Sequence, residues 1–163
     1  LVTKNKKIGV IATRATVANK AYVTQIEAHL PDVRVYQQAC PLLVPLVEEG
    51  WDEDPITNLI VYRYLSPLKS VDIDTLILGC THYPILKSPI KKVMGSGVEL
   101  VESGDCLANQ MKKDMALKKL VPNEQSQTGT VEFLSTDLSD GYSNLARRIV
   151  APVLFDEFQL IDL

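Results

Sequence analysis

The sequence predicts an α/β protein with an open, parallel, doubly wound sheet flanked by helices. Short aliphatic runs, typical of strands buried on both faces, alternate along the chain with longer segments whose apolar residues recur at helical spacing. The connections between them are short, as in parallel units whose strands are joined through helices. With 163 residues, 46% hydrophobic and 23% charged, the chain is long enough for one domain, or one and a half, with a real core.

The first strand–helix–strand unit occupies the start of the chain. A strand is expected at residues 7–12, after a basic and polar start, and a second strand at 33–36. Between them, Thr16 is expected to cap a helix over residues 17–30, which Pro31 ends. This order is typical of a parallel sheet.

An apolar stretch at residues 42–47, broken by Pro45, comes next. Glu48 and Glu49 follow it directly, and we expect them at the carboxyl end of a strand, where they could face a cleft. A helix is then expected to begin at Pro55 and to run to about residue 65.

The central feature of the sequence is the loop Gly79-Cys80-Thr81-His82-Tyr83-Pro84. It follows an expected strand over residues 71–78 and precedes an expected helix over 89–94, with Ser88 as its N-cap. A thiol, a hydroxyl and an imidazole therefore follow a buried strand. In open α/β sheets, ligands bind at the carboxyl ends of the strands.

The rest of the chain continues the alternation. A polar stretch at residues 122–129 has no apolar periodicity and is the best candidate for a boundary between two lobes. The other expected elements are a strand at 98–101, a helix at 105–120, a strand at 130–135, a helix at 142–150 that starts from Asp137 or Ser139, and a last strand at 155–161.

Composition excludes several functional classes. A net charge of −3 argues against a general binder of nucleic acid or acidic membranes, and no apolar run approaches the ~20 residues of a membrane span. The cysteines Cys40, Cys80 and Cys106 are odd in number and widely spaced, so we expect neither disulfides nor, with His29 and His82 as the only histidines, a zinc site. Without a signal peptide, this predicts a reducing, cytoplasmic compartment.

Five segments together resemble the glutamate racemases. The most specific is LILGCTHYP at residues 76–84, and the resemblance covers nearly the whole chain. The others are GVIATRATVANKAY at 9–22, ACPLLVPLVEEG at 39–50, VESG at 101–104 and the closing strand and helix at 133–147. The related aspartate racemases tend to carry another residue where His82 stands.

The resemblance implies a part of a two-lobe enzyme. That family has an Asp-Ser-Gly-x-Gly-Gly loop and a Cys-Asn-Thr loop in its amino-terminal half, and this sequence, which starts at Leu1 instead of Met, contains neither. By analogy, residues 1–108 form the complete second lobe, and residues 109–163 are elements that normally complete the first. The implied activity, interconversion of L- and D-glutamate for peptidoglycan precursors, would then be absent from this chain alone.

The resemblance also implies roles for particular side chains. The family uses two cysteines on opposite faces of the substrate and no pyridoxal phosphate or other cofactor. Cys80 would be one of these thiols, and a thiol near its ordinary pKa of ~8.5 needs its thiolate stabilised. His82 would assist proton transfer, Glu48 would lie near the site, and Thr81 would bind the substrate carboxylate. Thr13 and Thr16, after the first strand, could line the same cleft.

Each of these residues also has a purely structural interpretation. A cysteine at a strand end is often a small buried hydrophobe, a histidine or threonine in such a loop can cap it, and Glu48 can be a solvated charge. Two other functions stay open: a domain that binds a small carboxylate or associates with itself, and a racemase for another acid such as aspartate. Glutamate is the expected small-molecule partner in the leading interpretation.

Overall fold

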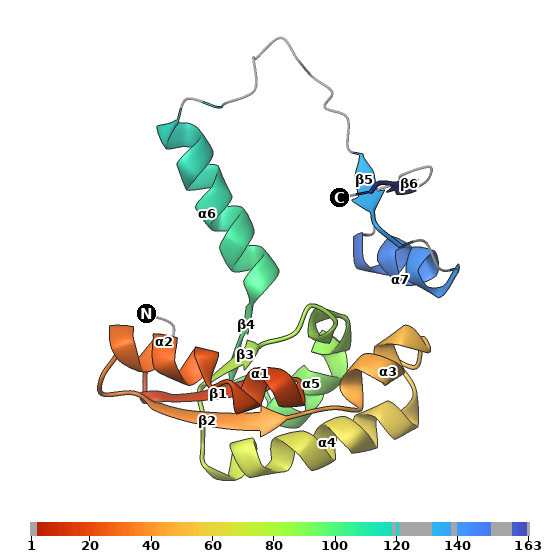
Figure 1. The fold of residues 1–163 in the computed structure, drawn as a ribbon. Helices are drawn as coiled ribbons and strands as arrows, with labels where there is room; N and C mark the ends of the chain where they lie inside the picture. The colour runs from red at the N-terminus through yellow and green to blue at the C-terminus, as the bar shows by residue number, and fades with distance from the viewer. Residues whose placement is uncertain (1–2, 119, 121–131, 138–139, 151–157, 163) are drawn as a thin grey trace. The chain divides into compact units, whose positions relative to one another are not determined.

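The computed structural model describes residues 3–118, 120, 132–137, 140–150 and 158–162. The chain divides into two compact units, Leu1–Met111 and Lys112–Leu163, and the division falls inside helix α6 (Ser103–Leu117) (Figure 1). Within the described residues, no helix is both long and apolar enough to cross a bilayer.

The first unit is built on a four-stranded sheet in the order β2-β1-β3-β4, with every neighbouring pair parallel. Its strands are β1 (Lys7–Ala12), β2 (Arg34–Ala39), β3 (Thr75–Leu78) and β4 (Glu99–Glu102). Because the strands are parallel, their carboxyl ends lie along one edge of the sheet. The predicted parallel α/β fold is confirmed.

Helices cover both faces of this sheet (Figure 1). They are α1 (Arg14–Ala18), α2 (Ala21–His29), α3 (Leu43–Glu48), α4 (Pro55–Ser70), the short 3-10 helix η1 (Tyr83–Leu86) and α5 (Lys87–Met94). On one face, Ile8 and Val10 of β1 pack with Ile26 of α2. Gly9 between them faces the other side, where an added Cβ would lie 3.4 Å from Leu68 of α4.

The expected helix over residues 17–30 is in fact two helices, and Thr16 is not its N-cap. Thr13 caps α1 instead, with its Oγ1 accepting from the Thr16 N–H at 3.4 Å. The break comes at Lys20, which has a left-handed backbone conformation with φ of 55°. The spacing of the apolar residues did not indicate a break between two helices at this position.

The apolar stretch before Glu48 is a helix, so the expectation that Glu48 and Glu49 follow a strand was wrong. Pro45 is the third residue of α3, in the first turn, where its missing N–H has no partner inside the helix anyway. Glu48 is the last residue of α3 and Glu49 is its C-cap.

Other helices and strands begin or end a few residues away from their predicted boundaries. Helix α4 continues past residue 65 through Pro67 to Ser70, and β3 begins only at Thr75. Helix α5 begins at Lys87, so Leu86 and not Ser88 is its N-cap.

The second unit contains a parallel pair of short strands, β5 (Phe133–Ser135) and β6 (Phe158–Leu160), and helix α7 (Asp140–Val150). The rings of Phe133 and Phe158 meet edge to face, with centroids 5.6 Å apart. These elements confirm the strand–helix–strand order that the sequence predicts here. The predicted loop at 122–129, Ser139 and residues 155–157 lie outside the described residues.

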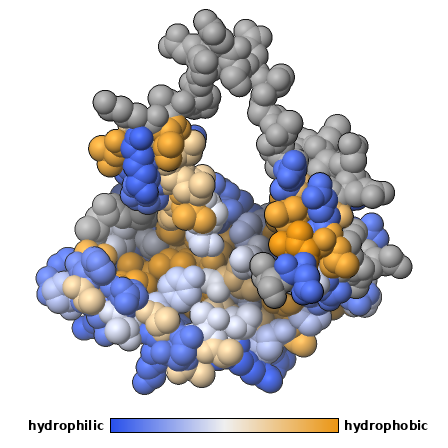
Figure 2. All heavy atoms as spheres, turned by 45° about the horizontal axis from the view of Figure 1, so that its top comes forward, coloured by the Kyte–Doolittle hydropathy of each residue, from blue (hydrophilic) through white to orange (hydrophobic). Residues whose placement is uncertain are grey.

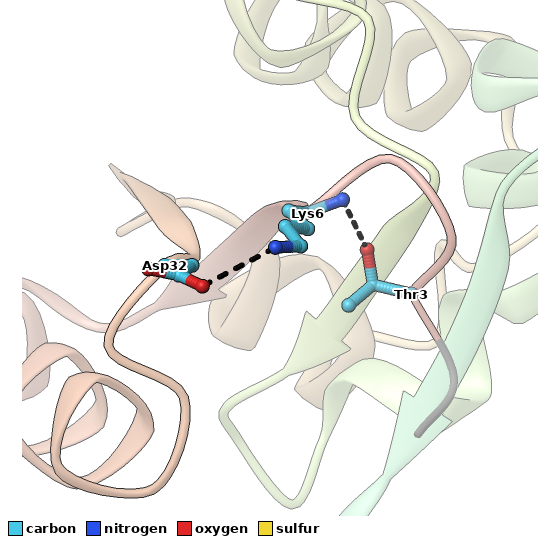
Figure 3. Close-up of polar contacts among 3 residues, drawn as sticks. All are labelled: Thr3, Lys6 and Asp32. Carbon is cyan, nitrogen blue, oxygen red and sulfur yellow. Dashed lines mark hydrogen bonds and ion pairs between the residues drawn. The ribbon is translucent and has the colours of Figure 1, made fainter.

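A turn before β1 is held by polar contacts (Figure 3). Lys6 has a φ of 62°, its N–H donates to Thr3 Oγ1 at 3.1 Å, and its Nζ lies 3.3 Å from Asp32 Oδ2. Thr3 Oγ1 in turn donates to Asp74 Oδ1 at 2.7 Å. The start of the chain is thereby tied to the residue that precedes β3.

Candidate active site at the carboxyl ends of the strands

The loop at residues 79–84 follows β3 and packs against the end of β1. The Gly79 N–H donates to the Ile11 carbonyl at 2.8 Å. A Cβ on residue 79 would lie 2.9 Å from that carbonyl oxygen and 3.2 Å from the Ala12 Cβ, so the approach leaves no room for a side chain. This close contact places Cys80 directly at the edge of the sheet.

Cys80, Thr81 and His82 form a tight turn that leads into η1. The Tyr83 N–H donates to the Cys80 carbonyl at 3.2 Å, and the Ile85 N–H donates to the His82 carbonyl at 3.2 Å. Within the turn, Cys80 Sγ lies 3.9 Å from His82 Nδ1, and Thr81 Oγ1 lies 3.3 Å from the same nitrogen. The thiol and the hydroxyl therefore share one imidazole nitrogen.

Glu48 approaches the other nitrogen of the same ring. Its Oε1 lies 3.8 Å from His82 Nε2, and the side chains of His82 and Glu48 are 22% and 54% exposed. The imidazole thus stands between a thiol and a carboxylate. Such an arrangement allows the ring to take the thiol proton at Nδ1 while the carboxylate stabilises the resulting imidazolium, as in other activated nucleophile and base pairs.

The three cysteines lie in different environments. Cys80 is half-buried and Cys106, on α6, is exposed. Cys40 is fully buried, and burial raises the pKa of its thiol to about 12. Its Sγ donates to the Gln38 carbonyl at 3.6 Å. Cys40 is therefore a core residue, and Cys80 is the cysteine next to an imidazole.

The two threonines follow β1, the strand that pairs with β3: Thr13 is the N-cap of α1, and Thr16 lies within α1. Ile11 pairs with Leu78, so Thr13 and Cys80 each stand two residues beyond a paired position. Thr13 Oγ1 lies 3.0 Å from Thr16 Oγ1 and also caps α1. Both hydroxyls are therefore engaged with each other at this edge of the sheet, while Thr81 is exposed.

One residue of the loop was given no role by the sequence. Tyr83 is fully buried, and its hydroxyl donates to the Cys40 carbonyl at 3.0 Å. A tyrosine between a polar turn and a buried helix could have signalled such a bond, because a buried hydroxyl needs a partner. Its partner, 43 residues away, could not be read from the sequence.

Two hollows of about 570 Å³ each border α5, away from the Cys80 turn. One is lined by surface lysines with Glu99 and Asp105, and the other by residues of α4 and α5. Among the described residues, no group of three or more His, Cys, Asp or Glu side chains is placed to hold a metal ion.

The model of the Asp/Glu/hydantoin racemase family matches residues 1–111. The chain belongs to this family. It is 38% identical over 162 residues to the glutamate racemase of Sulfurihydrogenibium sp. and 43% identical over 150 residues to that of Thermoanaerobacter sp. strain X514. These alignments cover 99% and 92% of this chain but 59% and 56% of the relatives.

Solved structures of glutamate racemases also match this chain. The glutamate racemase of Francisella tularensis, in complex with D-glutamate, superposes with a TM-score of 0.87 at 29% identity, over 99% of this chain and 59% of that one. The Aquifex pyrophilus glutamate racemase is 40% identical, with a TM-score of 0.63 over 96% of this chain and 57% of that one. The chain therefore spans somewhat more than half the length of the racemases it matches.

Proposed function

We propose that this chain is the carboxy-terminal portion of a glutamate racemase and supplies one of its two acid–base thiols. The observation that carries the proposal is the contact of Cys80 Sγ with His82 Nδ1, with Glu48 on the far side of the ring. The relatives named glutamate racemase, and the D-glutamate bound to the Francisella tularensis enzyme, support glutamate as the substrate.

In the proposed reaction, the Cys80 thiolate removes the α-proton from one face of glutamate and becomes a thiol. A second thiol, on the opposite face, delivers its proton to the carbanion and becomes a thiolate. Two protons change places, no oxidant or cofactor is needed, and the enantiomer is inverted. This sequence contains no Cys-Asn-Thr segment for the second thiol, so we expect the chain alone not to racemise glutamate.

In this scheme, His82 acts as the base for the Cys80 thiol, and Glu48 supports His82. Nδ1 takes the thiol proton, and Glu48 stabilises the imidazolium charge from Nε2. The exposed hydroxyl of Thr81 contributes a hydrogen bond to the substrate carboxylate, and Thr13 and Thr16 border the same edge from β1. The enzyme would provide D-glutamate for cell-wall precursors in the bacterial cytoplasm.

The remainder of the chain fits a partial enzyme. We propose that residues 109–163 belong to the first lobe of the two-lobe enzyme, whose other residues are not in this sequence. Helix α6 supports this, because it has no buried residue and carries large apolar side chains with exposed fractions of 40% to 81%: Leu107, Met111, Met115 and Leu117.

The test is the alkylation of each cysteine by iodoacetamide at pH 7, followed peptide by peptide. Cys80 should react faster than the more exposed Cys106, and His82→Asn should slow Cys80 by roughly tenfold while leaving Cys106 unchanged, since the imidazole then no longer accepts the thiol proton. An equal rate for Cys80 in both proteins would refute the thiol–imidazole pair.

A second measurement addresses the reaction itself. In D₂O, the chain should not convert one glutamate enantiomer into the other, as followed by chiral chromatography. Any slow exchange of an α-hydrogen should disappear in Cys80→Ser and persist in Cys106→Ser. Efficient racemisation by this chain alone would contradict the proposal.

A further inference from the structure

Tyr83 lies at the meeting point of three strand ends. Its hydroxyl donates to the Cys40 carbonyl at 3.0 Å, and the Cys40 N–H donates to the Ala12 carbonyl, the last residue of β1, at 2.9 Å. Cys40 itself directly follows β2. One short chain of hydrogen bonds therefore connects the loop after β3 to the ends of β2 and β1.

The same carbonyl also begins the helix that carries Glu48. The Leu43 N–H, at the start of α3, donates to the Cys40 carbonyl at 3.2 Å. This oxygen thus accepts from Tyr83 and from the first residue of α3, while Glu48 is the last residue of α3. Tyr83, which follows His82, and Leu43, the first residue of the helix that ends at Glu48, are thus hydrogen-bonded to one acceptor.

The hydroxyl is suited to a structural bond and not to proton transfer. The ring is fully buried, and burial, followed by the neighbouring Cys40, Cys80 and Tyr64, raises the pKa of Tyr83 well above its usual range. The hydroxyl therefore stays protonated at neutral pH and remains a donor to Cys40.

The contacts of the imidazole depend on small displacements. His82 lies 3.9 Å from Cys80 Sγ and 3.8 Å from Glu48 Oε1, both at the long end of contact distances. Tyr83 is the next residue after His82, so its bond fixes the backbone that presents the ring. Both contacts therefore depend on where the turn holds the ring.

We propose that Tyr83 is a positioning residue for the thiol–imidazole–carboxylate set: its hydrogen bond to the Cys40 carbonyl holds the Cys80–His82 turn in register with α3, so that His82 faces Cys80 and Glu48 together. This inference rests on the proposed function, because the register matters only if His82 serves Cys80.

The test compares Tyr83→Phe with Tyr62→Phe in the complete chain. Both changes remove one phenolic oxygen, but Tyr62 is an exposed residue of α4. Tyr83→Phe keeps the buried ring and should slow Cys80 alkylation at pH 7 by roughly three- to tenfold, the factor that corresponds to an ordinary hydrogen bond. Cys106 is the internal reference, and its rate should stay unchanged.

A second readout separates positioning from general stability. The imidazole NMR signals of His82 should shift in Tyr83→Phe, and those of His29, at the end of α2, should not. Tyr62→Phe should leave both histidines and both thiol rates as they are. A lower melting temperature of Tyr83→Phe with an unchanged Cys80 rate would overturn the proposal, because it would show packing alone.

The outcomes distinguish this inference from the proposed function. If His82→Asn slows Cys80 and Tyr83→Phe does not, the thiol–imidazole pair stands and the positioning role falls. If neither variant slows Cys80, the proposed function falls and the inference falls with it.

Discussion

The described residues before and after Glu102 differ in how much surface they bury. In the sheet domain, which we define as residues 3–102, side chains such as Val10, Leu65 and Leu76 are completely buried. Beyond it, α6 has no buried residue, and Leu145, at 9% exposure, is the one buried apolar side chain among the described positions.

Helix α6 shows that the described residues after Glu102 leave large apolar side chains exposed. Leu107, Met111 and Met115 recur at every fourth position and so share one face of the helix, with 62%, 53% and 40% exposure. Figure 2 shows hydrophobic side chains at the surface in this region. The stability of the chain must therefore come mainly from the sheet domain, because hydrophobic burial is the dominant favourable contribution to folding.

The largest expected effect separates the two regions directly. Leu76→Ala in β3 should lower the free energy of unfolding by about 2–5 kcal/mol, since it leaves a cavity in a fully buried site. Leu134→Ala in β5, at a position that is 51% exposed, should change it by no more than about 0.5 kcal/mol. Urea unfolding followed by circular dichroism measures both. Equal losses would show that the second region has a core of its own.

A smaller effect is expected from two glycines. Gly79→Ala should destabilise the chain by about 1–3 kcal/mol, because its Cβ would meet the Ile11 carbonyl oxygen at 2.9 Å. Gly104→Ala, in α6, is the matched control: a Cβ there meets nothing within 4 Å, so stability should stay within about 0.5 kcal/mol. Thermal unfolding of both variants tests the contrast, and a neutral Gly79→Ala would show that the loop can move away from β1.

The sequence predicted the parts of the fold that depend on neighbours along the chain. Alternating strands and helices, and the turn that brings Cys80 near His82, follow from residues close in sequence. The helical state of α3 was missed because Pro45 suggests a break, although a proline in the first turn does not prevent a helix.

Contacts between segments that are far apart in the sequence could not be predicted from the local residue pattern. The sequence placed Glu48 beside a cleft, but through a strand that is in fact a helix, and it did not indicate the 3.8 Å approach of Glu48 to His82. Nothing in the sequence indicated that the Tyr83 hydroxyl would donate to the Cys40 carbonyl. Both contacts arise because β1, β2 and β3 end along one edge of the sheet, which only the packed sheet determines.

The last prediction concerns the electrostatics of the sheet domain. Desolvation raises the pKa of Asp74, but hydrogen bonds from Thr3, Asn5, Lys4 and Thr75 outweigh it and lower the pKa to about 2. Since the folded pKa lies below the ordinary value of 3.8, Asp74 stabilises the fold above about pH 4, and this contribution is lost as the pH falls towards 2.

Asp74→Asn should therefore reduce the loss of stability between pH 4 and pH 2, as measured by urea unfolding with the single tryptophan, Trp51, as the probe. Asp72→Asn is the control, because it removes the same charge two residues away and asparagine tolerates the φ of 59° found there. Its acid dependence should match that of the unmodified chain. If both variants flatten the profile equally, net charge and not the anchored start of the chain governs acid unfolding of the sheet domain.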